Sequence, residues 1–222
     1  MTGHTLYISP EYNPHSLERD WGFFMRAQYP EIYAGLAHSL DDMRLTLFAR
    51  IANILATTGN DQNIQAYTGK VAAKVTTDAI AKSSASLYDE VGLDTLSLAL
   101  LADVPIHRPL HLTHNSLVGQ WRWLRQVWRH CVPLTYPSRP DTGLEKFAPH
   151  PEIVEAIRHG RNNAAIALLR QSFQKLDSGQ SDKTCIRYQT FLANLTLFCP
   201  FIGTELLWRQ GLITAVKDRR LD

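Results

Sequence analysis

Apolar residues recur at intervals of three and four along most of this chain, which is the spacing of amphipathic α-helices. Strict alternation of apolar and polar residues, the pattern of half-buried strands, is scarce. One helical face is formed by Ile32, Leu36, Leu40, Met43, Leu47 and Ile51. The pattern therefore predicts an all-α fold.

Proline, glycine and capping residues divide this pattern into separate helices. A first helix is expected from Pro14 to Tyr29, and Pro30 opens a longer one that ends near residues 57–60. Further helices are expected over 61–84, 87–103, 117–131, 150–159 and 162–176, followed by two apolar helical segments on either side of Pro200. Residues 133–149 contain four prolines and form the one long loop.

Size and composition favour one globular domain with a substantial core. The chain has 222 residues, of which 45% are hydrophobic and 20% are charged. Its formal net charge of +2 is mild, whereas nucleic-acid and anionic-membrane binding usually need a concentrated basic face. We therefore expect neither nucleic acid nor membrane as a partner.

Cysteine usage and the lack of long apolar stretches predict a soluble cytoplasmic protein. Cys131, Cys185 and Cys199 are widely spaced and lack a CxxC pattern, so neither a disulfide scaffold nor a zinc knuckle is expected. No apolar stretch has the length of a signal peptide core or of a membrane span. The GxSxG, Walker and GxGxxG motifs do not occur, so serine hydrolase and nucleotide-dependent mechanisms have no support.

A stripe of potential metal ligands stands out in the middle of the chain, formed by Asp103, His107, His111 and His114. On a continuous helix, residues at these intervals would share one face. Imidazole and carboxylate together suit zinc, iron, nickel or manganese better than calcium. The alternative is a helix face whose histidines are only solvated or hydrogen-bonded in the core. Two prolines, Pro105 and Pro109, predict that this helix is kinked or interrupted.

A wider pattern includes this stripe. It consists of Asp103-Val104-Pro105-Ile106-His107, Asn115, the segment 150–160 that reads HPEIVEAIRHG, and Ala164 and Ala165. In this order and separation the residues resemble the FCD domain, the helical effector-binding domain of GntR-type bacterial regulators. The match covers residues 103–173 well and extends weakly back to about residue 40. It implies an antiparallel helical bundle over 40–178 within a single domain, with 1–39 as an N-terminal extension and 183–222 as additional C-terminal helices.

The resemblance implies that Asp103, His107 and His150 hold a metal ion. The usual fourth ligand of the family would fall at Ser172, and serine is a poor ligand for a divalent transition metal. Two histidines and one carboxylate with vacant positions form the arrangement of non-haem iron enzymes. Fe(II) is therefore the favoured cofactor, with zinc, manganese or nickel as alternatives. The winged helix-turn-helix of such regulators has no counterpart in residues 1–39.

These residues predict a metal-dependent enzyme, a non-haem Fe(II) oxidoreductase or oxygenase acting on a small carboxylate-bearing metabolite. His111 and His114 are the candidate catalytic groups for proton transfer. Arg44 and Asn115 are the candidate substrate-binding residues, because a guanidinium clamps a carboxylate through two hydrogen bonds.

Other interpretations remain open at this stage. Arg44 is alternatively an exposed helix residue paired with Asp41 or Asp42. The whole bundle is alternatively a metal-dependent, small-molecule-sensing effector domain without its DNA-binding module, with homodimerisation left open. A third alternative is a purely structural helical protein with a vestigial site.

The segment 120–129 places arginines on one helical face and tryptophans on another. Arg122, Arg125 and Arg129 share the first face, and Trp121, Leu124 and Trp128 share the second. Basic residues among aromatic ones occur in nucleic-acid surfaces. We favour an ordinary amphipathic helix with a solvated basic side.

Overall fold

A computed structural model describes residues 11–58, 73–78, 83–134, 149–176 and 182–212, with side chains for all of these except 58 and 182–185. Within these ranges the protein has ten helices and two short strands, which confirms the all-α prediction. The helices are α1 (Pro14–Gln28), α2 (Pro30–Gly35), α3 (Leu40–Thr58), α4 (Ser84–Val91), α5 (Leu93–Leu101), α6 (His114–Cys131), α7 (Pro151–Arg158), α8 (Asn162–Gln174), α9 (Asp182–Phe198) and α10 (Pro200–Arg209). The strands are β1 (Val75–Thr77) and β2 (Leu110–Leu112).

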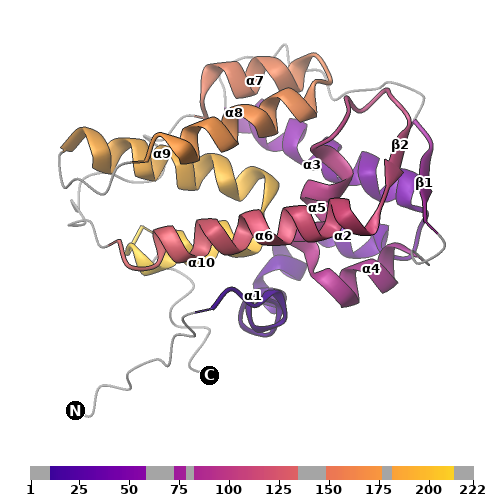
Figure 1. Cartoon of the computed structure of the whole chain (residues 1–222), viewed down its shortest axis with the longest axis horizontal. Helices are drawn as coiled ribbons and strands as arrows, with labels where there is room; N and C mark the ends of the chain where they lie inside the picture. Colours follow the sequence, from indigo (N-terminus) through magenta and orange to yellow (C-terminus); the bar gives the residue numbers. More distant parts are fainter. Residues whose placement is uncertain (1–10, 59–72, 79–82, 135–148, 177–181, 213–222) are drawn as a thin grey trace.

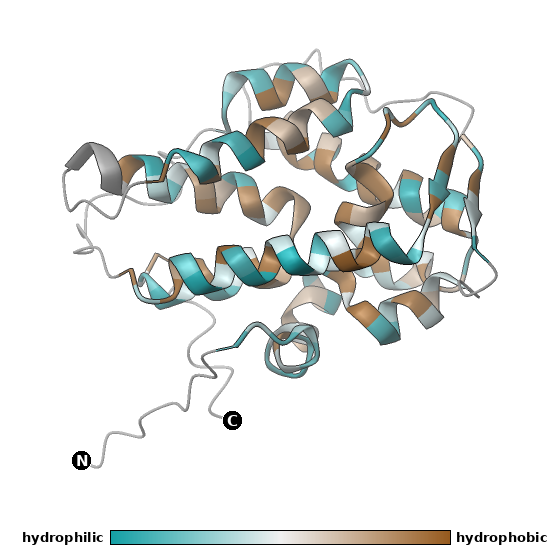
Figure 2. Cartoon of the chain, viewed as in Figure 1, coloured by the Kyte–Doolittle hydropathy of each residue, from teal (hydrophilic) through white to brown (hydrophobic). Residues whose placement is uncertain are grey.

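Helix α5 is the centre of the molecule. Its nine residues are all buried, and it packs against α3, α4, α6, α8, α9 and α10 (Figure 1). The pairs α7–α8 and α9–α10 are antiparallel neighbours in the chain, and α1 packs on α10. Apolar side chains from all of these helices form one continuous cluster, while the outer turns are largely hydrophilic (Figure 2). Burial of this apolar surface is the main force that holds the helices together.

The junction between α9 and α10 lies inside the core and receives its hydrogen bonds from other helices. The Asp94 carboxylate on α5 accepts the backbone amides of Phe201 at 3.1 Å and Ile202 at 2.7 Å. Ser97 on α5 donates to the carbonyl of Phe198 at 2.7 Å, and the Arg50 guanidinium on α3 donates to that of Leu197. Helix ends leave such groups without partners inside the helix, so a buried junction requires donors and acceptors from elsewhere.

Close packing at this junction also requires a small residue on α10. A Cβ atom on Gly203 would lie 2.6 Å from the Cα atom of Thr196 on α9, a distance that real Cβ contacts do not show. A second glycine, Gly92, has φ of 75° and lets the chain turn between α4 and α5. Any larger residue at either position would strain the structure.

Two expected helices differ from the structure. The helix expected from Pro30 to residues 57–60 is broken at residues 36–39, and Ser39 caps the new start by accepting the amide of Asp42. The helix expected over 61–84 is wrong for its described part, because residues 75–77 form β1 in parallel with β2. The remaining residues 59–72 and 79–82 lie outside the described ranges, as do 135–148 of the expected long loop.

The strand pair explains why helix periodicity fails there. Val75 pairs with Leu110 and Thr77 with Leu112, and the Val75 amide also donates to the Asp41 carboxylate at 2.6 Å. Valine and threonine are β-branched and favour extended backbone once a partner strand is available. That partner lies 35 residues away in the sequence, where a local pattern does not reveal it.

A membrane-spanning helix was not expected. None of the described helices is both long enough and apolar enough to cross a bilayer.

The buried carboxyl of Asp94 predicts a pH dependence of stability. Burial raises its pKa to about 7, against the opposing effect of the Ile202 and Phe201 amides and of Arg50. The folded protein therefore holds this proton more tightly than the unfolded chain does, and the free energy of unfolding should fall as pH rises from about 4 to about 7. The slope from this group is at most about 1.4 kcal/mol per pH unit, and it vanishes above the folded-state pKa.

Urea unfolding of the wild type and of Asp94→Asn at several pH values measures this effect. The variant does not titrate at this position, so the difference between the two proteins isolates Asp94 from all other groups. We expect the wild type to lose stability relative to the variant as pH rises through this window. A difference that stays constant with pH would show that Asp94 keeps an ordinary pKa.

Candidate functional site

The predicted ligand stripe does not lie on one helix. Helix α5 ends at Leu101, and residues 102–109 form turns and bends that carry Asp103 and His107. His111 lies on β2, and His114 is the first residue of α6. The prediction that these four residues share one helical face is therefore wrong. The interruption of the helix expected from Pro105 and Pro109 is confirmed.

Arg44 holds this non-helical segment in place. Its side chain is only 1% exposed, and its Nε donates to the carbonyl of Leu100 at 2.8 Å. Nη1 donates to the carbonyl of Arg108 at 2.8 Å, and Nη2 donates to those of Val104 at 3.0 Å and Pro105 at 2.9 Å. Four of the five N–H groups of the guanidinium thus bind one short stretch of backbone.

These contacts test the two interpretations of Arg44, as a substrate-binding residue and as an exposed helix residue. An exposed arginine paired with Asp41 or Asp42 is wrong, because the side chain is buried and bonded to backbone carbonyls. The substrate-binding role stays a prediction, and at most one N–H group is left for it. Asn162 on α8 adds to the same scaffold by donating to the carbonyls of Leu101 and Val104.

Asp103 and His107 are both exposed on this scaffolded segment. Asp103 acts electrostatically on Arg170 of α8, whose guanidinium pKa is lowered by burial and raised by this carboxylate. Among the described residues, no three His, Cys, Asp or Glu side chains are grouped closely enough to hold a metal ion. The structure therefore does not bring Asp103, His107 and His150 together.

His150 has a structural role at the start of α7. Its Nδ1 atom accepts the backbone amide of Glu152 at 3.3 Å, so the proton of the neutral ring belongs on Nε2. A histidine that binds a metal through Nε2 usually donates from Nδ1 instead. His150 shares a pocket with Ser172, so these two positions of the resemblance do lie together.

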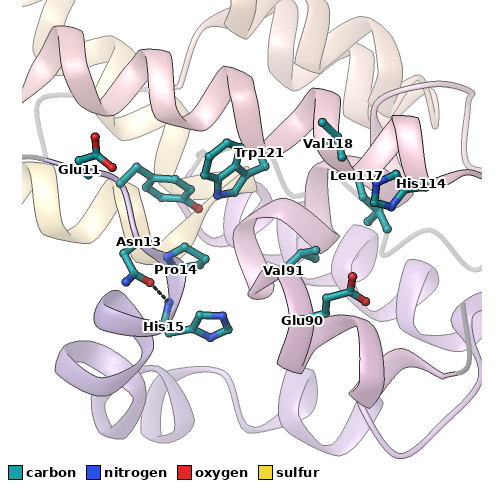
Figure 3. A pocket seen from close by; sticks show the side chains of 11 residues that line it. Glu11, Asn13, Pro14, His15, Glu90, Val91, His114, Leu117, Val118 and Trp121 are labelled. Atoms are coloured by element: carbon teal, nitrogen blue, oxygen red, sulfur yellow. Dashed lines mark hydrogen bonds between the residues drawn. The ribbon is translucent and has the colours of Figure 1, made fainter. Parts of the chain in front are cut away.

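The two candidate catalytic histidines lie in different surroundings. His111 is exposed, with Nδ1 2.9 Å from the Thr76 hydroxyl and Nε2 3.2 Å from the Asp78 carboxylate. His114 lines a cleft of about 640 Å³ between α1, α4 and α6 (Figure 3). Asn115, the other candidate substrate-binding residue, is exposed in the first turn of α6.

The cleft around His114 combines an apolar wall with a polar rim (Figure 3). Trp121 and Val118 of α6 face Val91 of α4 and Pro14 of α1 across it. The carboxylates and imidazoles that line it are those of Glu11, His15, Glu90 and His114. Its size is in the range of small-molecule sites, but its histidines and carboxylates do not form a metal-binding group.

A surplus of basic residues begins beside this cleft and follows α6. Residues 104–134 carry four arginines, four histidines and no aspartate or glutamate. On α6 the residues Asn115, Gly119, Arg122, Gln126 and Arg129 are exposed at helical intervals, while Leu117, Leu124, Val127 and Trp128 face the core. We call Arg122, Gln126 and Arg129 the basic ridge; the side of α6 turned to the viewer in Figure 2 is largely hydrophilic.

Few carboxylates neutralise this surface. Arg125 lies 3.4 Å and Arg129 3.7 Å from the same Glu11 carboxylate, which is itself 65% exposed. Exposed ion pairs of this kind contribute little and exchange readily for other anions. The small net charge of the whole chain does not reflect this local surplus, although the arginine face of residues 120–129 does. Its sequence signal is the absence of aspartate and glutamate from residue 104 to residue 140.

Comparison with known proteins gives one partial likeness. No family model matches the chain. A leucine–tRNA ligase of Zymomonas mobilis subsp. mobilis is 26% identical to it over an alignment of 141 residues, and the match covers 58% of this chain. The match spans only 16% of that relative, so the chain corresponds to a small part of its length.

The role of Arg44 is testable by substitution. We expect Arg44→Met to lower the free energy of unfolding by about 3 kcal/mol or more, because buried carbonyls of residues 100–108 would lose their donors. The matched control is Arg122→Met on the exposed ridge, which should change stability by less than about 0.5 kcal/mol. Urea unfolding measures both. If Arg44→Met is as stable as the wild type, the scaffolding role is refuted and ligand binding becomes the better account of this residue.

Proposed function

We propose that this protein is an RNA-binding helical module, with the basic ridge of α6 contacting the sugar–phosphate backbone. The observation that carries the proposal is the exposed cationic surface of residues 104–134, which contains no carboxylate of its own. The partial likeness to a leucine–tRNA ligase supports tRNA as the first RNA to test.

The ridge has the chemistry that a polyanionic strand requires. Arginine offers planar, paired N–H donors to phosphate oxygens and stays charged at all physiological pH values. Arg122 and Arg129 lie seven residues apart, about 10 Å along the helix axis, so they can contact different phosphates of one strand. The amide side chains of Gln126 and Asn115 supply donors and acceptors for a 2′-hydroxyl or a base edge.

This proposal departs from the expectation that no nucleic acid binds. That expectation rested on the small net charge of the whole chain and on the interpretation of residues 120–129 as an ordinary amphipathic helix, whereas phosphate contacts depend on local charge density. The carboxylates of the described residues lie mostly on other elements, including Asp41 and Asp42 on α3 and Asp89 and Glu90 on α4. Among the described residues, Glu11 alone forms ion pairs with the arginines of α6, and a phosphate can take its place.

Substitution of the ridge arginines tests the proposal. Arg122→Gln combined with Arg129→Gln should lower the affinity for tRNA about tenfold or more. The slope of log K against log salt concentration should become shallower by about one per arginine, since fewer counterions are released. Filter binding or fluorescence anisotropy at several salt concentrations measures both quantities.

The control removes the same charge elsewhere. Arg19 and Arg26 on α1 have side chains that are 75% and 62% exposed, and each pairs with a nearby carboxylate on its own helix. Arg19→Gln combined with Arg26→Gln should leave tRNA affinity close to that of the wild type. Equal losses in both double variants, or no binding of tRNA by the wild type at low salt, would refute the proposed surface.

A metal-dependent function is a second proposal, and the FCD resemblance alone supports it. It comprises the Fe(II) oxidoreductase and the metal-dependent sensing domain, both with Asp103, His107 and His150 as ligands. In their present arrangement these three side chains do not fit one ion, and Nδ1 of His150 is occupied as an acceptor. We therefore derive no reaction step from them.

Metal loading distinguishes this second proposal from the first. If it holds, the purified protein retains Fe(II), or zinc, manganese or nickel, at a ratio of one ion per chain after anaerobic loading and desalting. His107→Ala and His150→Ala should each abolish retention. His159→Ala, which removes the exposed histidine that follows α7, should not. Elemental analysis that finds no stoichiometric metal in the wild type would eliminate both the enzyme and the metal-dependent sensor.

A further inference from the structure

A second pocket, apart from the basic ridge, opens between α7, α8 and α9. It has a volume of about 540 Å³, which is within the range of small-molecule sites. Its lining includes Lys175 at the end of α8, Arg187 and Thr190 on α9, and His150 at the start of α7. Elements from three helices thus converge on one space.

The charge of this pocket is unbalanced. Lys175 and Arg187 come from different helices and both line the cavity, and both are exposed. No carboxylate of the described residues forms an ion pair with either of them, and none lines the pocket. Two cations that share one cavity repel each other, so an anion placed between them is stabilised by both.

Hydrogen-bond donors are available beside these cations. Thr190 has a side-chain hydroxyl without a hydrogen-bond partner among the described residues, and Nε2 of His150 carries the ring proton. Ser172 is different, because its hydroxyl already donates to the carbonyl of Leu168 at 3.0 Å. The amide of Asn194 is also engaged, by the His150 backbone and by the carbonyl of Thr190. The two free donors, the Thr190 hydroxyl and Nε2 of His150, therefore line the same pocket as Lys175 and Arg187.

The wall of this pocket also includes an exposed apolar side chain. Ile186 lines the pocket and is 58% exposed, one of two large apolar side chains in the described residues that remain so accessible; the other is Phe23 on α1. An organic group lying on Ile186 would remove this apolar surface from water. The pocket therefore fits a ligand that joins an oxyanion to an apolar group.

We propose that this pocket binds a phosphate monoester with an apolar organic group. The phosphate lies between Lys175 and Arg187, accepts the Thr190 hydroxyl, and directs its organic group over Ile186. A dianion with several terminal oxygens matches two cations and neutral donors better than a single negative charge does. The site uses no residue of the basic ridge, so it stands independently of RNA binding.

Isothermal titration calorimetry with three probes tests this assignment. The probes are phenyl phosphate, inorganic phosphate and phenol. We expect the wild type to bind phenyl phosphate more tightly than inorganic phosphate, and phenol not measurably. Lys175→Gln combined with Arg187→Gln should weaken phenyl phosphate about tenfold or more, since two charge-assisted contacts are lost. The Arg19→Gln/Arg26→Gln protein is the charge-matched control and should bind like the wild type.

A further variant and a further ligand separate the alternatives. Ile186→Ser should weaken phenyl phosphate while leaving inorganic phosphate unchanged, because only the organic group contacts this side chain. The Lys175→Gln/Arg187→Gln protein should keep its tRNA affinity. No binding of phenyl phosphate by the wild type, or equal weakening in the α1 control, would overturn the site. A parallel loss of tRNA affinity would overturn the small-molecule assignment and give the pocket to an RNA backbone phosphate.

Discussion

Inside this protein, Arg50 and Asp94 form the polar centre around which the last two helices are placed. Arg50 on α3 donates to the carbonyl of Leu197 near the end of α9, and the Asp94 carboxyl on α5 accepts the first free amides of α10. The residue between these helices, Cys199, has no side-chain oxygen with which to cap α10 itself. Because the junction is buried, its backbone groups would lose water without gaining partners if either side chain were missing. The packing of α9 and α10 on the core therefore depends on two polar side chains that lie far earlier in the chain.

Buried backbone groups also need side-chain partners in the segment that follows α5. Arg44 and Asn162 supply donors to carbonyls that no helix or strand satisfies. These hydrogen bonds fix residues 102–109 in a series of turns and bends. That path separates the histidines of the stripe from one another and turns His107 and Arg108 outward. Buried arginines thus organise the backbone, while the arginines of α6 remain at the surface. The sequence contains both kinds, and only their burial distinguishes them.

Much of the fold follows from local pattern, and the exceptions have a common cause. The two faces of α6 and the break at Pro200 could be predicted, since both depend on residues close together in sequence. The β1–β2 pair and the route of residues 102–109 could not, because each is decided by partners that distant parts of the chain contribute. The spacing of Asp103, His107, His111 and His114 suggested one helical face for the same local reason. Of the site, the shared pocket of His150 and Ser172 matches the resemblance, whereas the gathering of three metal ligands does not appear among the described residues.

The contact between Trp21 and Glu205 bears on how the protein folds, because it joins the two ends of the described chain. The indole N–H on α1 donates to the carboxylate on α10 at 2.5 Å, and 184 positions separate the two residues in sequence. The bonds from Arg50 and Asp94 to the α9–α10 junction span 147 and 107 to 108 positions. Contacts between such distant residues make folding slower than in helical proteins built from neighbouring pairs. During synthesis the contacts of α1 and α5 with α10 can form only after α10 has been made, so this part of the core is completed late.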